Sequence, residues 1–132
     1  MELSVTQENF ARALSIVGRV ASNRTGLPIL GNILLRTDGT RLLVAATNLE
    51  IAATCYVGAK IVKQGDITLP ARLVSEYVSS LPKGTIELSS KGTSMTISSG
   101  NYSSIMTGVD AAEFPELPSI DEKQAVTYTI AE

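Results

Sequence analysis

The sequence predicts an α+β fold in which two helices pack on antiparallel sheet. Residues 6–21 and 70–82 carry apolar residues at the three- and four-residue spacing of amphipathic helices. Short runs rich in strand-forming residues lie between and after them, separated by turns that contain glycine. These links are too short for the crossover that parallel neighbours require, so the strands should be antiparallel. The simplest packing places both helices on one face of one sheet.

The first helix is expected to follow a short strand at the N-terminus. Thr6 should cap it, because its hydroxyl accepts a hydrogen bond from a free amide of the first turn, and Glu8 complements the helix dipole. Arg12 and Arg19 fall together on the polar side. The helix should continue to about Ala21, and its apolar side comprises Phe10, Ala13, Leu14, Ile16, Val17, Val20 and Ala21.

Residues 33–57 predict three strands. The runs 33–37 and 41–47 are joined through Asp38-Gly39, a pair that tolerates positive φ and favours a tight hairpin. Residues 48–57 read as a third strand, whose apolar side carries Leu49, Ile51, Ala53, Cys55 and Val57.

The second helix is bracketed by Pro70 near its start and Pro82 past its end. Its expected apolar face comprises Leu73, Val74, Tyr77, Val78 and Leu81, opposite Arg72, Ser75, Glu76 and Ser79. Further strands, the last of them after an acidic stretch that contains prolines, are expected at residues 85–90, 93–99, 102–109 and 125–130.

The composition indicates one folded domain. The chain has 132 residues, and 44% hydrophobic against 18% charged residues lies outside the disordered class. The single cysteine, Cys55, lies in an apolar run, which favours a buried and reduced thiol. The N-terminus has no signal-peptide pattern, and no stretch approaches the roughly 18 apolar residues of a membrane helix. A cytoplasmic location without membrane contact is expected.

The net charge of −2 is unevenly distributed along the chain. Residues 1–100 carry ten Lys or Arg against seven Asp or Glu, a net +3, whereas residues 101–132 carry one Lys against six acids, a net −5. A polyanion could therefore approach one face and be repelled by another. Chance scatter explains the numbers equally well.

The sequence contains few of the residues and motifs that catalysis usually requires. The chain contains no histidine, which removes the commonest general base and metal ligand. Neither glycine-rich phosphate motif occurs, and one cysteine cannot build a zinc site or, unactivated, serve as a nucleophile. The alternative left open is a carboxylate-dependent metal enzyme that uses Asp110 and Glu113. A simpler interpretation is that these acids cap or solvate a turn before Phe114-Pro115.

The sequence contains arginines that are suitably spaced to bind phosphate groups. Arg12 and Arg19 project from one helical line about two turns apart, and Ser15 between them is small enough to let a phosphate approach. Arg24 extends this line into the following loop. Arginines that are merely solvated would show the same pattern. Because the chain lacks the motifs of sequence-specific DNA and RNA readers, any nucleic-acid contact should be non-specific.

Five segments form an ordered set of matches to one family. They are residues 24–32 (RTGLPILGN), residues 46–51 (ATNLEI), Leu69-Pro70-Ala71-Arg72, Leu81-Pro82 and residues 110–118 (DAAEFPELP). Together they resemble the N-terminal domain of the bacterial sliding clamp, the beta subunit of DNA polymerase III, whose signature includes R-x-x-LPIL-x-N. Asn48 departs from the family, which usually has Asp there, and so lacks one acceptor charge.

The resemblance implies a DNA-clamp fold and a processivity factor without catalytic residues, metal or cofactor. In such clamps three domains per chain close as a homodimer ring around duplex DNA, with helices lining the hole and sheets forming the outer wall. Residues 1–122 would be the first domain, and residues 123–132 the start of the first strand of a truncated second domain. The replicative polymerase and the clamp loader would bind through domains absent from this chain.

The same resemblance, with the helical projection, yields the expected site residues. Arg24 and Arg72 match family motifs directly as DNA contacts, whereas Arg12, Arg19 and Lys83 rest on the projection. The strand that pairs with the third domain of the other subunit would comprise Tyr102, Ser103, Ser104, Ile105 and Met106. A generic protein-interaction domain that uses this edge is the second alternative.

Overall fold

The computed structural model describes residues 1–21 and 28–115 in full, and the backbone of residues 125–130. In chain order the elements are β1 (Glu2–Thr6), α1 (Gln7–Gly18), η1 (Pro28–Gly31), β2 (Asn32–Asp38), β3 (Arg41–Thr47), β4 (Ala52–Gly58), β5 (Lys60–Lys63), β6 (Asp66–Pro70), α2 (Ala71–Ser80), β7 (Thr85–Lys91), β8 (Ser94–Ser99), β9 (Tyr102–Thr107), η2 (Ala111–Glu113) and β10 (Ala125–Ile130).

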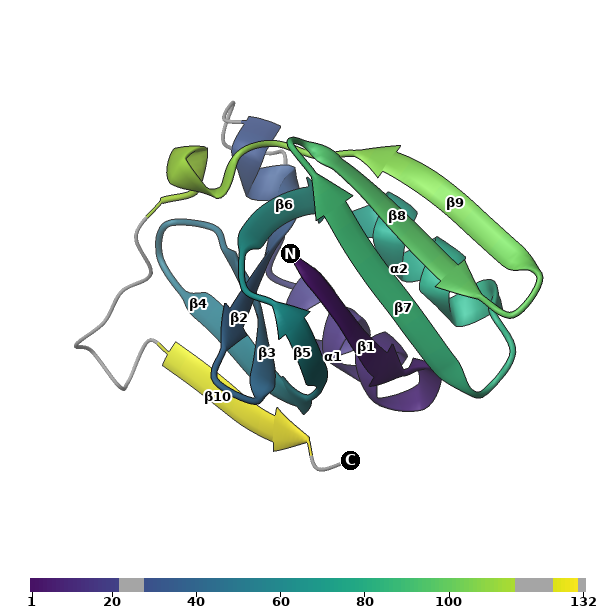
Figure 1. Ribbon diagram of the computed structural model, residues 1–132. Coiled ribbons are helices and arrows are strands. Elements are labelled where there is room, and N and C mark those ends of the chain that lie inside the picture. Colours follow the sequence, from purple (N-terminus) through teal and green to yellow (C-terminus); the bar gives the residue numbers. More distant parts are fainter. Residues whose placement is uncertain (22–27, 116–124, 131–132) are drawn as a thin grey trace.

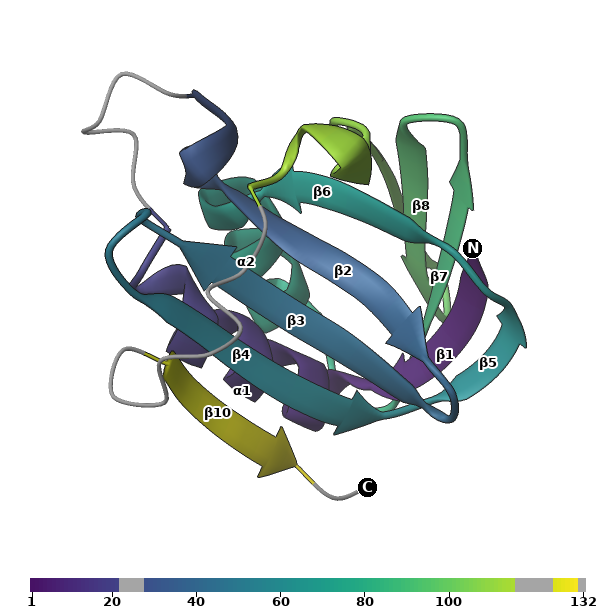
Figure 2. The ribbon, with the colours of Figure 1, turned by 90° about the vertical axis from the view of Figure 1, so that its left-hand side faces the viewer.

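The strands form two sheets, and the two helices pack against them, which confirms the predicted α+β fold. One sheet has the order β5-β1-β7-β8-β9 and the other β10-β4-β3-β2-β6. Figure 1 shows both helices behind the strands, and Figure 2 shows the second sheet in front of them. All described strand pairs are antiparallel except β10 with β4, which is parallel.

The expectation of a single sheet was wrong because the chain changes sheets at β5. Only Ala59 separates β4 in one sheet from β5 in the other, and the chain returns to the first of these sheets at β6. Neither β5 nor β6 was predicted. Strand β5 is four residues long and has lysine at both ends, which is too short for an alternating pattern to be recognised.

Helix α1 begins as predicted. The Thr6 hydroxyl accepts a hydrogen bond from the Asn9 amide at 3.4 Å, and the helix buries Phe10, Ala13, Leu14 and Val17. It ends at Gly18 rather than near Ala21. There the Val20 amide bonds to the Val17 carbonyl, which is the i→i−3 pattern of a tightened last turn.

Residues 48–51 form a turn rather than the start of the predicted third strand. The Asn48 side-chain oxygen accepts hydrogen bonds from the amides of Glu50 and Ile51, both at 2.9 Å, as expected of an Asx turn. Leu49 has a positive φ of 79° and is 52% exposed. The local hydrogen bonds of the asparagine therefore prevail over the alternation of apolar residues.

Helix α2 lies between its two prolines as predicted, but its buried stripe is narrower. Ala71, Val74, Val78 and Leu81 are buried, at spacings of three and four residues. Leu73, expected in the apolar face, is 50% exposed. It flanks the buried stripe without belonging to it.

A polar joint connects the two sheets. The Thr68 amide donates to the Val109 carbonyl, and the Val109 amide to the Thr68 carbonyl, both at 3.0 Å. The buried Thr68 hydroxyl also donates to the Val109 carbonyl at 2.9 Å and accepts from the Asn32 side-chain amide at 3.0 Å. The joint thus ties β6 to the segment that follows β9, and Asn32 of the predicted signature has a structural role in it.

Gly108 gives a direct test of this joint. A Cβ at Gly108 would overlap the Thr68 carbonyl oxygen, whereas a Cβ at Gly18 would meet only the Ser75 Oγ, at 3.8 Å. We expect Gly108→Ala to lower the free energy of unfolding by about 1–3 kcal/mol because it overpacks the joint. Gly18→Ala, the control, should leave stability unchanged or raise it by up to about 1 kcal/mol. Urea unfolding of both variants measures this, and an unchanged midpoint for Gly108→Ala would contradict a tight joint.

Candidate nucleic-acid interface

The two helices lie antiparallel and in contact, and a groove opens between them at one end. At the opposite end, the Gln7 side-chain amide donates to the Val78 carbonyl at 2.9 Å, and the Gln7 backbone amide donates to the Gly84 carbonyl at 2.8 Å. The beginning of α1 is thereby bonded to the end of α2. The end of α1 consequently meets the beginning of α2.

The groove has a volume of about 430 Å³. It is open to solvent, and its wall combines two arginines, two hydroxyl side chains and small residues, including Ser15, Gly18, Arg19, Ala71, Arg72 and Ser75. Arg19 comes from the end of α1 and Arg72 from the first turn of α2. Two arginines that are 53 positions apart in the numbering are thus brought to one concave surface.

Arg72 occupies a position that helix stability alone would not favour. The N-terminus of a helix carries a partial positive charge and free backbone amides, so an acidic residue or a polar cap is favourable there. Helix α2 has neither, since Pro70 provides no side-chain cap and its first turn contains no acid. Arg72 adds a further positive charge, and its side chain is 91% exposed. Arginine and unbonded amides together suit an anion such as phosphate.

Arg19 has a structural explanation as well. It is the C-cap of α1, where a cation interacts favourably with the negative end of the helix dipole. Its position at the helix end therefore does not by itself indicate a binding role. Its proximity to Arg72 in the groove does, because tertiary packing rather than local helix stability brings the two arginines together.

The other predicted DNA contacts lie elsewhere on the helices. Arg12 is exposed and pairs with Glu8 at 3.6 Å. Lys83 is exposed in the loop after α2 and adjoins Gly84, which is bonded to the start of α1. Since α1 has 12 residues, its two ends are about 18 Å apart, so Lys83 lies at the opposite end from the groove. Arg24 lies outside the described residues.

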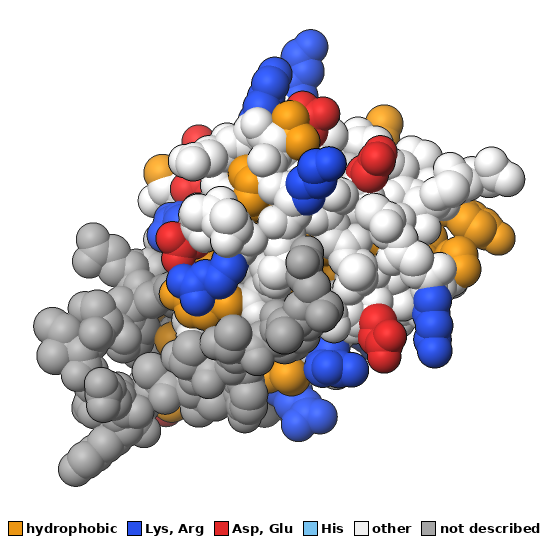
Figure 3. Space-filling view, turned by 60° about the horizontal axis from the view of Figure 1, so that its bottom comes forward, with side chains coloured by type: hydrophobic (Ala, Val, Ile, Leu, Met, Phe, Trp, Pro, Cys, Tyr) orange, Lys and Arg blue, Asp and Glu red, His pale blue; other side chains and the backbone are white. Residues whose placement is uncertain are grey.

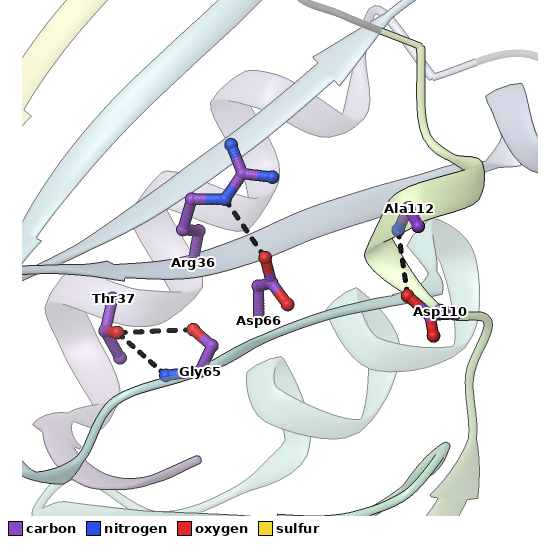
Figure 4. A network of polar contacts seen from close by, with 6 residues as sticks. All are labelled: Arg36, Thr37, Gly65, Asp66, Asp110 and Ala112. Atoms are coloured by element: carbon purple, nitrogen blue, oxygen red, sulfur yellow. Dashed lines mark hydrogen bonds and ion pairs between the residues drawn. The ribbon is translucent and has the colours of Figure 1, made fainter.

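Arginines on the sheets are held by neighbouring strands or across a hairpin. Arg36 on β2 pairs with Asp66 on β6 at 3.3 Å (Figure 4). Arg41 pairs with Asp38 at 3.2 Å and also lies over the ring of Tyr56, 4.1 Å from its centroid. On the underside of the view in Figure 1, Lys and Arg are spread out among uncharged surface, Asp and Glu (Figure 3). Charges of both signs are thus interspersed on that face.

The predicted dimer edge, β9, is the outermost strand of its sheet (Figure 1). It pairs with β8 on one side, in the register Met95 with Met106. Ile105 is 72% exposed and Tyr102 is also exposed, whereas Met106 is buried against the core. The strand thus offers a free backbone edge with an apolar side chain on its surface.

The acidic residues Asp110 and Glu113 lie at the two ends of the short helix η2. The Asp110 carboxylate accepts a hydrogen bond from the Ala112 amide at 2.9 Å and so caps η2 (Figure 4). Within residues 1–21 and 28–115, no three acidic or cysteine side chains are grouped to hold a metal ion. The alternative of a carboxylate-dependent metal enzyme is therefore not favoured.

Cys55 is fully buried, and burial raises the pKa of its thiol above the ordinary value. A neutral, enclosed thiol is a poor nucleophile. Among the described helices, none has the length and apolar character needed to cross a membrane.

Three residues of the interface were not singled out from the sequence as contributors to it. Gln7 has no place in the predicted faces of the helix, yet it is buried and bonds the two helices. Glu8 and Glu76 were assigned to polar faces, and each pairs with an arginine one turn away. The four-residue spacing of these pairs was the available signal.

Comparison with known proteins identifies the family. Residues 1–118 match the family model described as the DNA polymerase III beta subunit, N-terminal domain. The beta sliding clamp of Synechococcus elongatus is 36% identical over 131 residues, which covers 96% of this chain and 34% of the relative. This chain thus spans about a third of the relative's length.

Solved structures agree with the sequence comparison. The DNA polymerase sliding clamp of Caulobacter crescentus matches with a TM-score of 0.85 and 33% identity, over 92% of this chain and 34% of that one. The sliding clamp of Bacillus subtilis matches with a TM-score of 0.87 and 27% identity, over the same shares. The chain belongs to the family of bacterial beta sliding clamps, the beta subunits of DNA polymerase III, and corresponds to their N-terminal domain.

Proposed function

We propose that this chain acts as the first domain of a DNA sliding clamp and that the groove between α1 and α2 faces the encircled duplex. The observation that carries the proposal is the position of Arg72, in the uncapped first turn of α2 and beside Arg19 in the groove. Local helix stability does not account for Arg72 there, whereas contact with a phosphate does.

The contact would be electrostatic and independent of base sequence. Arginines and hydroxyl side chains bind phosphate and sugar without reading base edges. Arg12 and Lys83 would extend the positive surface along the helices, and Arg24, from its place in the family signature, is proposed to join them. A ring that encircles DNA gains from contacts of this kind, because they do not favour one position on the duplex over another.

The proposed whole protein is a homodimer ring that confers processivity on the replicative polymerase and has no catalytic residues of its own. In this proposal residues 1–122 form the first domain and residues 123–132 begin a second one. Polymerase and clamp loader would bind through other domains. The buried, neutral Cys55 thiol fits a reducing, cytoplasmic location.

The DNA contact is tested by replacing the two arginines of the groove. We expect the Arg19→Ala/Arg72→Ala double variant of the chain to bind a short labelled duplex more weakly. The slope of log affinity against log salt should fall by about 0.9 for each phosphate that the variant no longer neutralises. Fluorescence anisotropy across a salt series measures both quantities.

The matched control removes two arginines from the sheets, as Arg36→Ala/Arg41→Ala. This variant has the same net charge, but its changes lie away from the helices, so its salt slope should stay close to that of the unchanged chain. If the two double variants lose affinity equally, the groove has no special role.

The proposed dimer edge is tested in a chimera, in which this chain replaces the N-terminal domain of the Synechococcus elongatus relative. We expect the chimera to sediment as a dimer and Ile105→Lys to convert it to a monomer, because a charged residue on an edge strand opposes pairing. Val62→Lys is the control, since Val62 is 64% exposed on β5, the opposite edge of the same sheet. A dimer that survives Ile105→Lys would argue against β9 as the interface.

A further inference from the structure

Two arginines of the helix surface are each paired with a carboxylate one turn away. Arg72 Nε lies 3.3 Å from Glu76 Oε1, and Arg12 Nη2 lies 3.6 Å from Glu8 Oε1. All four side chains are more than half exposed. Water and salt screen pairs that are this exposed. Their contribution to folding stability is therefore small.

The Arg72–Glu76 pair is also arranged unfavourably for a helix. A glutamate that precedes its basic partner by four residues stabilises a helix more than the reverse order, and here the arginine comes first. The arginine lies at the positive end of α2, and the glutamate lies more than one turn from that end, so the helix dipole favours neither position. The Glu8–Arg12 pair has the favourable order, with Glu8 in the first turn of α1.

We propose that Glu76 weakens the hold of Arg72 on DNA phosphate, and that Glu8 does the same at Arg12. This inference rests on the proposed function. Each carboxylate pairs with the guanidinium group that a phosphate would otherwise bind, and the negative charge of the carboxylate repels the duplex. A phosphate must therefore displace a carboxylate that stays within reach, which shortens the life of each contact. Such intramolecular competition keeps the helix surface attractive to DNA without fixing the ring in place.

Arg19 provides an internal contrast. Within the part of the chain that the structure describes, it has no carboxylate partner, although it lines the same groove as Arg72. Arg19 accordingly retains its full attraction for phosphate, whereas Arg72 and Arg12 are attenuated.

The test is Glu76→Gln, which keeps the size of the side chain and removes its charge. We expect the duplex affinity of the chain to rise between about 1.4- and five-fold at low salt, the range that corresponds to an exposed ion pair, and the salt slope to become steeper. Asp66→Asn is the matched control. It removes the carboxylate partner of Arg36 on the sheets and makes the same change in net charge, so the affinity should rise by less than it does for Glu76→Gln.

A double-mutant cycle separates competition from general repulsion. If Glu76 acts through Arg72, Glu76→Gln should have little effect in a chain that already carries Arg72→Ala. Thermal unfolding of each variant excludes a change in folding as the cause. The inference is overturned if Glu76→Gln leaves duplex affinity unchanged or lowers it, or if its effect is the same with and without Arg72.

The outcome distinguishes this inference from the proposed function. If Arg72→Ala weakens binding and Glu76→Gln does not strengthen it, only the attenuation is wrong. If Arg72→Ala itself has no effect, the groove is not the DNA contact and both proposals fail.

Discussion

The contact between the two helices determines most of what this molecule presents to its surroundings. Gln7 bonds the start of α1 to the last turn of α2 through the Val78 carbonyl, which also accepts a hydrogen bond from the Leu81 amide. Because the helices run antiparallel, this fixes which ends meet at the other side. There Gly18 lies beside Ser75, and the arginines at positions 19 and 72 share one groove. The interface is thus a product of helix packing rather than of any single motif.

The arginines on the sheets differ from those on the helices in how they are paired. On the sheets, Arg36 and Arg41 are bonded to acids on a neighbouring strand or across a hairpin. On the helices, Arg12 and Arg72 pair with acids of their own helix, and such pairs exchange readily with external anions because they are exposed. The buried joint at Thr68 keeps the two sheets in a fixed relation behind the helices. The arginines of the helix pairs are therefore more available to an external anion than Arg36 and Arg41.

Local patterns predicted the helices and most strands, and the remaining errors have physical causes. Thr6, the prolines around α2 and the glycine turns act within a few residues, so the sequence reveals them. Asn48 redirected an apparently alternating run by bonding to its own neighbours. The division into two sheets depends on strand partners far apart in the chain, which periodicity does not report. Likewise, periodicity placed Arg12 and Arg19 on one side of α1. It could not place Arg19 beside Arg72, because that proximity depends on how the two helices pack.

The central claim is that duplex DNA contacts the groove between α1 and α2. The most direct measurement is an NMR titration of the isotopically labelled chain with a short duplex at low salt, followed through backbone amides. The account predicts that the largest shifts occur at Ser15, Gly18, Arg19, Ala71, Arg72 and Ser75, and that they diminish as salt is added. Largest shifts on the strands that carry Arg36 and Arg41, with the amides of the groove unmoved, would contradict it.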